Sequence, residues 1–145
     1  MSANELREKP KLRYRIVAAI GAILWATLIF MLSAIPGDSY PSHPGFLNYI
    51  AHFCEYAIFT ALLLVAIHGD KRKLWLSALI AIVIASLYGS SDELHQFFVP
   101  NRDSSPIDWL TDTIGAIAGG AITIFFISFR IVKRSREKDA KTGQS

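Results

Sequence analysis

The chain has 145 residues, of which 52% are apolar and 19% are charged, with a net charge of +3, a pI of about 9.1 and a mean hydropathy of +0.33. This length fits one domain, and the composition is too apolar for a disordered chain and too poor in Pro and Gly for a low-complexity one. The single cysteine, Cys54, excludes an internal disulfide framework and any multi-cysteine zinc or iron–sulfur site.

The first predicted element is an apolar helix that follows a basic segment, residues 1–15. Residues 16–35 carry no charge, and this run is long enough to cross a hydrocarbon core of about 30 Å at about 1.5 Å per residue. It is longer than the apolar core of a signal peptide, and Leu32-Ser33-Ala34-Ile35-Pro36 is a poor cleavage sequence. We therefore expect an uncleaved membrane helix.

Three further segments are apolar along most of their length, and they cover residues 46–67, 74–91 and 107–129. Each is long enough to span a membrane or nearly so, and together with the first they leave little chain for a soluble domain. The pattern predicts an all-α polytopic membrane protein, with a four-helix membrane domain over residues 16–129 and a disordered basic tail over residues 130–145.

The Lys and Arg residues alternate between the segments that flank these spans. Five precede the first span, none lies between the first and second, three lie between the second and third, one lies between the third and fourth, and six follow the fourth. The positive-inside rule then places both termini in the cytoplasm and the spans in the cytoplasmic membrane. Fourteen basic and five acidic residues lie on the cytoplasmic side, giving +9, and one basic and seven acidic residues lie outside or in the membrane, giving −6. Membrane topology and contact with the lipid bilayer explain the basic clusters, so we expect no nucleic-acid partner.

Ionisable side chains inside the spans point to a functional site, because charge in a bilayer core is costly and usually faces a bundle interior or a watery cavity. On the second span Asn48, His52 and Glu55 are spaced i, i+4 and i+7, so they share one helix face. The third span runs outward and ends in Asp92-Glu93-Leu94-His95-Gln96. Both polar sets are therefore expected at the outer end of the bundle.

The fourth span combines acidic and small residues on one face. Asp108, Asp112, Gly115 and Gly119 follow helical spacing. The Gly115-x-x-x-Gly119 pattern lets another helix backbone approach closely, and that helix belongs either to the same chain or to a second subunit. Because the glycines share the acidic face, we favour a contact within the chain.

Arg102 is the one basic residue in the predicted outer loops. Its guanidinium suits a fork that holds a phosphate or carboxylate, and it equally suits an ion pair with Glu93 or Asp108 that closes the loop onto the bundle. The polar residues together form either a hydrogen-bonding network that locks the helices or an outward-facing functional site, and we favour the site.

These residues resemble the VanZ-like family of small bacterial membrane proteins, one member of which is linked to teicoplanin resistance. The resemblance runs from the first span through Gly119, and its markers are His52-Phe53-Cys54-Glu55-Tyr56, Asp92-Glu93-Leu94-His95-Gln96, Pro100-Asn101-Arg102, and Asp108 with Asp112-x-x-Gly115-x-x-x-Gly119. Many family members carry Gly where this chain has Asn101, and Asn where it has Asp112, so this chain adds a carboxyl group to the site. The family implies an integral membrane protein of the cell envelope and supplies no mechanism.

Two classes of function follow, and we place the first slightly ahead. It is a non-catalytic envelope protein that binds or moves an envelope lipid, a phosphate-bearing ligand or a proton, or that alters glycopeptide access to the cell surface. The candidate ligand-binding residues are Asn48, Asp92, Gln96, Arg102, Asp108 and Asp112. A proton-coupled transporter of this size would need a homodimer.

The second class is a membrane enzyme that acts on a lipid-linked envelope intermediate. The candidate acid or base groups are His52, Glu55, Glu93 and His95, because imidazole titrates near neutral pH and carboxylates can orient it. Glu55, Glu93 and His95 are also candidate ligands of a divalent metal that would neutralise substrate phosphate. No recognised nucleophile motif accompanies them.

Overall fold

The computed structural model describes residues 12–39, 45–69 and 73–142. These residues form α1 (Leu12–Ser33), the short 3-10 helix η2 (Gly37–Ser39), α2 (Gly45–Ile67), α3 (Leu74–Gln96) and α4 (Pro106–Thr142). Four helices are long and apolar enough to cross a membrane, and no strand occurs in the described ranges. The predicted all-α class with four spans is therefore confirmed.

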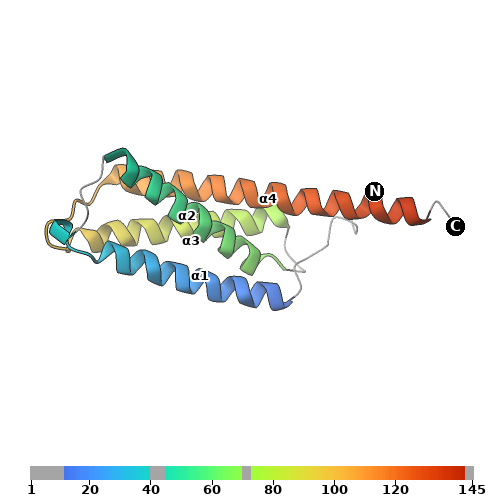
Figure 1. The fold of residues 1–145 in the computed structure, drawn as a ribbon, viewed down its shortest axis with the longest axis horizontal. Helices are drawn as coiled ribbons and strands as arrows, with labels where there is room; N and C mark the ends of the chain where they lie inside the picture. Colours follow the sequence, from blue (N-terminus) through green and yellow to red (C-terminus); the bar gives the residue numbers. More distant parts are fainter. Residues whose placement is uncertain (1–11, 40–44, 70–72, 143–145) are drawn as a thin grey trace.

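The helices run alternately in opposite directions along one axis (Figure 1). The beginning of α1 and the end of α4 lie toward one end of the bundle. Residues 34–39, which include η2, and residues 97–105, which join α3 to α4, lie at the other end. We call this second end the loop end.

Two helices run further than the apolar patterns indicated. α3 continues past residue 91 to Gln96, so the acidic motif belongs to the helix itself. α4 continues past residue 129 to Thr142, where a disordered tail was expected. Residues 130–142 contain neither Gly nor Pro, and six of these thirteen residues are Lys or Arg, which are good helix formers. The helix therefore has no local reason to end at the apolar boundary.

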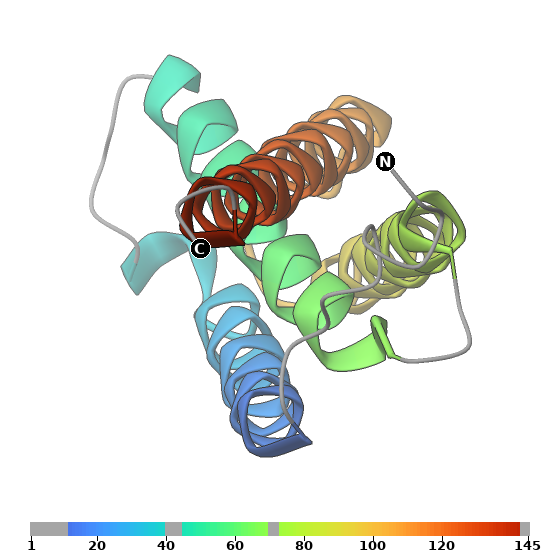
Figure 2. The same cartoon turned by 90° about the vertical axis from the view of Figure 1, so that its right-hand side faces the viewer.

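α2 lies at the centre of the bundle and contacts the other three long helices, most extensively α4 (Figure 2). α1 packs mainly on α2 and has little contact with α3. A Cβ atom at Gly115 would overlap the backbone of Phe53, and one at Gly119 would overlap the backbone of Ala57. The glycine face of α4 therefore lies directly against α2 of the same chain, with no side chain between them.

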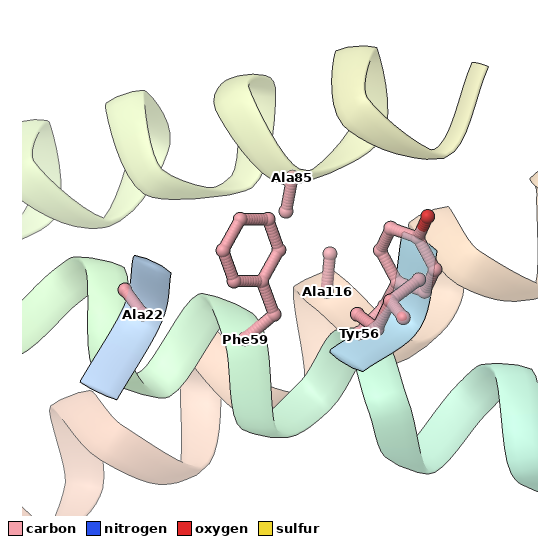
Figure 3. Packing of buried hydrophobic residues seen from close by; sticks show 6 residues of the cluster. Ala22, Tyr56, Phe59, Ala85 and Ala116 are labelled. Atoms are coloured by element: carbon pink, nitrogen blue, oxygen red, sulfur yellow. The ribbon is translucent and has the colours of Figure 1, made fainter. Parts of the chain in front are cut away.

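The middle of the bundle is filled by aromatic rings of α2 set among small residues of the other helices (Figure 3). This buried cluster consists of Ala22, Ile29, Tyr56, Phe59, Ala85 and Ala116. Two polar aromatic atoms near it reach backbone carbonyls: Trp25 Nε1 donates to Glu55 O at 2.9 Å, and Tyr88 Oη donates to Ala26 O at 2.7 Å. In an apolar surrounding these donors have no water to bond, so they pair with backbone carbonyls. Both bonds join α1 to a neighbouring helix.

The two connections at the loop end are joined to each other. Gly37 N donates to Pro100 O at 3.1 Å, and the Asn101 side chain donates to the Asp38 carboxylate. Asn101 has a φ of 55°, the left-handed region that Gly and Asn adopt most readily. This junction places Arg102, the next residue, beside the ends of α1 and α3.

Candidate functional site

Buried polar side chains gather in the half of the bundle nearest the loop end. They come from all four long helices and comprise Ser33, His52, Asp92, Glu93, Gln96, Asp108 and Asp112. Hydrogen bonds and proximity divide them, together with Arg102, into two neighbouring groups. We call His52, Glu93, Asp108 and Asp112 the inner cluster, and Ser33, Asp92, Gln96 and Arg102 the cleft network.

The inner cluster lies between α2, α3 and α4. His52 Nδ1 lies 2.9 Å from Asp112 Oδ1, which joins α2 to α4. Glu93 Oε2 accepts a hydrogen bond from the backbone N of Ser105 at 2.8 Å, so the start of α4 holds the carboxylate of α3. Gly89 leaves room for Asp112, because a Cβ there would lie 3.0 Å from Asp112 Oδ2.

The cleft network runs from α1 to the loop that follows α3. Ser33 Oγ donates to Asp92 Oδ1 at 2.6 Å, and Gln96 Nε2 donates to Asp92 Oδ2 at 3.0 Å. Arg102 then donates from Nε to Gln96 Oε1 at 3.3 Å and from Nη1 to Leu32 O at 3.2 Å. These bonds fix the guanidinium plane at the mouth of the bundle.

A cleft opens between the two groups. Its lining comprises Ile29, Leu32, Ser33, Asn48, Ala51, His52, Glu55, Asp92, Gln96 and Arg102. Its cavity volume is about 20 Å³, room for about one water molecule and far below the range of about 300–1,000 Å³ that is common for pockets enclosing a drug-sized ligand. A larger group can therefore meet these residues only at the mouth of the cleft or after the cleft widens.

The structure brings most of the residues singled out in the sequence to this end of the bundle. Those lining the cleft are Asn48, His52, Glu55, Asp92, Gln96 and Arg102, with Asn48 exposed. Glu93, Asp108 and Asp112 lie deeper, in the inner cluster. His95 stands apart: its ring lies 4.5 Å from that of Phe30, and its Nδ1 is 3.5 Å from Ser33 Oγ.

The candidate metal ligands Glu55, Glu93 and His95 accordingly fall in three different surroundings. Among the described residues, the group that can offer three close ligand atoms is His52, Glu93 and Asp112.

Three residues of the site were not singled out in the sequence. Ser33 was considered only as part of a cleavage sequence, and nothing local relates it to Asp92. Ser105 holds Glu93 through its backbone, which no side-chain pattern reveals. Gly89 did carry a signal, because a glycine inside an apolar helix costs about 1 kcal/mol relative to Ala and usually has a packing reason.

The arrangement supports binding and proton transfer more readily than nucleophilic catalysis. Ser33 Oγ donates to Asp92 Oδ1 at 2.6 Å and lies 3.5 Å from His95 Nδ1, so its closer partner is a carboxylate and not the histidine base that activates a serine nucleophile. His52, oriented by Asp112, has the geometry of an acid or base group.

Four helices able to cross a membrane, with a polar cleft at one end, define a multi-pass integral membrane protein. The family model described as VanZ/LLP1 matches residues 13–128, which include every residue of the inner cluster and the cleft network. The chain therefore belongs to the VanZ family, as its motifs predicted. No curated protein and no solved structure matches it.

Proposed function

We propose that this VanZ family protein binds the phosphate-bearing headgroup of an envelope lipid at the mouth of the cleft. In this proposal the protein lies in the bacterial cytoplasmic membrane with both termini in the cytoplasm, and the loop end faces outward. The observation that carries the proposal is the position of Arg102, whose guanidinium is fixed at the cleft wall by Gln96 and by the Leu32 carbonyl.

The other lining groups narrow the chemistry of the ligand. A guanidinium fork matches the geometry of phosphate oxygens, which supports an anionic headgroup. Glu55 and Asp92 line the same cleft, and their carboxylates favour hydrogen-bond donors on the same molecule. A phosphate that carries hydroxyl groups, as in a glycerol or sugar phosphate headgroup, satisfies both demands.

The apolar side of the cleft supports a lipid as the source of that headgroup. Ile29 and Leu32 of α1 line it, and the neighbouring residues Leu28 and Met31 expose apolar side chains on the outside of the bundle. An acyl or isoprenyl chain lying along α1 would bring its headgroup to the mouth of the cleft, where the phosphate would meet Arg102 without entering the water-sized cavity.

Native mass spectrometry of the purified protein tests this proposal. We expect retention of phosphatidylglycerol or a polyisoprenyl phosphate, and no comparable retention of diacylglycerol, which lacks phosphate. Arg102→Ala should weaken binding at least about 10-fold, because a charge-assisted hydrogen bond contributes about 1.5–3 kcal/mol. Arg130→Ala, at an exposed arginine of α4 outside the cleft, is the matched control and should bind as the wild type does. Equal binding by the two arginine variants would contradict the proposal.

The link to teicoplanin belongs to the same proposal and has its own test. Occupation of an outward headgroup site would change how lipid-linked material is presented to a glycopeptide. Expression in a susceptible host should raise the inhibitory concentration of teicoplanin, and the Arg102→Ala variant should not. An unchanged inhibitory concentration with the wild type would remove the resistance role and leave lipid binding in place.

A second candidate function is supported by the bond between His52 and Asp112. A histidine oriented by a carboxylate is the usual form of a general base, and His52 also lines the cleft. Incubation with the bound lipid, followed by mass analysis, separates the two functions. Turnover that is lost in His52→Gln would favour a lipid-modifying enzyme, and binding without turnover would favour the binding protein.

A further inference from the structure

The inner cluster has the donor set of a metal site. His52 of α2, Glu93 of α3 and Asp112 of α4 can each offer one ligand atom, and these atoms lie within 4.8 Å of one another. All three side chains are buried, with exposed fractions of 5%, 7% and 0%. Three helices thus bring one nitrogen and two carboxylate donors to a single point away from water.

Unpaired oxygen atoms in the same cluster point independently to a missing partner. Glu93 Oε1, Asp112 Oδ2 and Asp108 Oδ1 are buried and have no hydrogen-bond partner among the residues that the structure describes. Leaving a buried polar atom unpaired costs about 1–3 kcal/mol, and more when the atom is charged. Three such oxygens from three carboxyl groups in one cluster are the surroundings that a cation would stabilise.

The separation of His52 and Asp112 fits coordination as well as it fits a hydrogen bond. Two ligand atoms about 2.1 Å from a metal and 90° apart lie about 3 Å from each other. His52 Nδ1 and Asp112 Oδ1 are 2.9 Å apart. The distance between these two atoms therefore allows a shared cation in place of the shared proton, and the Glu93 ligand atom, which lies within 4.8 Å of the other two, would move closer to join them.

We propose that the inner cluster binds one divalent transition metal ion through His52, Glu93 and Asp112. The imidazole donor favours Zn²⁺, Mn²⁺ or Fe²⁺ over Mg²⁺ and Ca²⁺, which prefer oxygen ligands. Asp108 lies one turn before Asp112 on α4 and adds negative charge beside the ion. Three protein ligands leave at least one coordination position for a water or another oxygen ligand.

The surrounding structure is arranged to hold these ligands. The backbone N of Ser105 fixes the second oxygen of Glu93, and Gly89 leaves space for the Asp112 carboxylate. Orienting contacts of this kind are typical of metal sites and tune their affinity. This inference goes beyond lipid binding and does not require it, because the metal alone is the probe in its test.

Metal analysis of the full-length protein tests the site directly. Protein purified without chelator should carry about one equivalent of a transition metal; after chelation, titration with Zn²⁺ or Mn²⁺ should restore one equivalent. Glu93→Gln and Asp112→Asn should weaken binding at least about 100-fold, since even second-shell changes cost about 10–100-fold. Asp103→Asn removes an exposed carboxylate of the loop between α3 and α4 that belongs neither to the cleft lining nor to the ligand group, and it should bind as the wild type does.

A spectroscopic measurement on the unaltered chain guards against variants that fail to fold. Co²⁺ added to the chelated wild-type protein should give the visible absorption bands of nitrogen and oxygen coordination, and Zn²⁺ should displace them. The proposal is overturned if the wild type binds neither Zn²⁺ nor Co²⁺ at millimolar concentration. It is overturned equally if the Asp103→Asn variant loses the metal while the Glu93→Gln and Asp112→Asn variants retain it.

Discussion

Single residues at the loop end determine how the two connections beside the cleft are held together. Asn101 occupies the left-handed backbone region with a φ of 55°, and its side chain reaches Asp38 across the two connections. Gly would adopt the same backbone angle without a steric penalty, but it has no side chain that could reach Asp38. Asn101 therefore keeps the turn and adds a cross-link between the loops.

Two substitutions at Asn101 separate the backbone effect from the hydrogen bond. Both Asn101→Ala and Asn101→Gly lose the bond to Asp38, but only Ala must hold a Cβ in the left-handed region, which costs about 1–2 kcal/mol. We expect Asn101→Ala to lower the free energy of unfolding by about 1–2 kcal/mol more than Asn101→Gly does. Titration with SDS from mixed micelles measures this difference, and equal losses would show that the backbone angle is unimportant.

At the scale of elements, spacing along the sequence predicted which residues share a helix face but not which faces meet. The i, i+3 spacing placed His52 with Glu55, and the i, i+4 spacing placed Asp108 with Asp112, because helical geometry alone dictates this. The pairing of His52 with Asp112 depends on how α2 and α4 are rotated and staggered, and that is set by the glycine contact at Phe53 and Ala57. His95 and Glu93 are two residues apart on α3, so they lie on different faces of the helix and contact different neighbours. The sequence therefore indicates which residues are candidates for the site, and helix packing determines which of them lie together.

The contact between α2 and α4 should be the most sensitive to added volume. Gly119→Ala normally would favour a helix by about 1 kcal/mol, but here its Cβ overlaps the backbone of Ala57. Overpacking against backbone should reverse the sign, and we expect a loss of about 3 kcal/mol in the free energy of unfolding. Gly120→Ala is the matched control: its Cβ would meet the end of the Ile82 side chain, which can move. SDS titration should place Gly120→Ala within about 1 kcal/mol of the wild type, and a Gly119→Ala variant that is equally stable would contradict the backbone contact.

At the scale of the whole molecule, α4 is longer than a membrane is thick. Its 37 residues extend about 55 Å, against about 30 Å for the hydrocarbon core. If the cleft lies near one membrane surface, the basic residues that follow position 129 project beyond the other surface. In Figure 1 the end of α4 extends past the other helices. The fold thus separates an acidic end from a basic end, and the net charge of +3 conceals this division.

The separation of an acidic end from a basic end predicts how the protein is oriented in the membrane. The proposed outward-facing cleft depends on that orientation. Cys54 is the only cysteine, so a Cys54→Ser background allows single cysteines to be placed at exposed Asp103, in the loop end, and at exposed Asp139, in the far part of α4. The positive-inside rule predicts that a membrane-impermeant maleimide labels Asp103→Cys in intact cells and labels Asp139→Cys only after permeabilisation. Both positions should react in detergent, which controls for local accessibility. The reverse pattern would turn the cleft toward the cytoplasm. The ligand would then have to come from the inner leaflet. The positive-inside rule would no longer explain the positions of the basic segments.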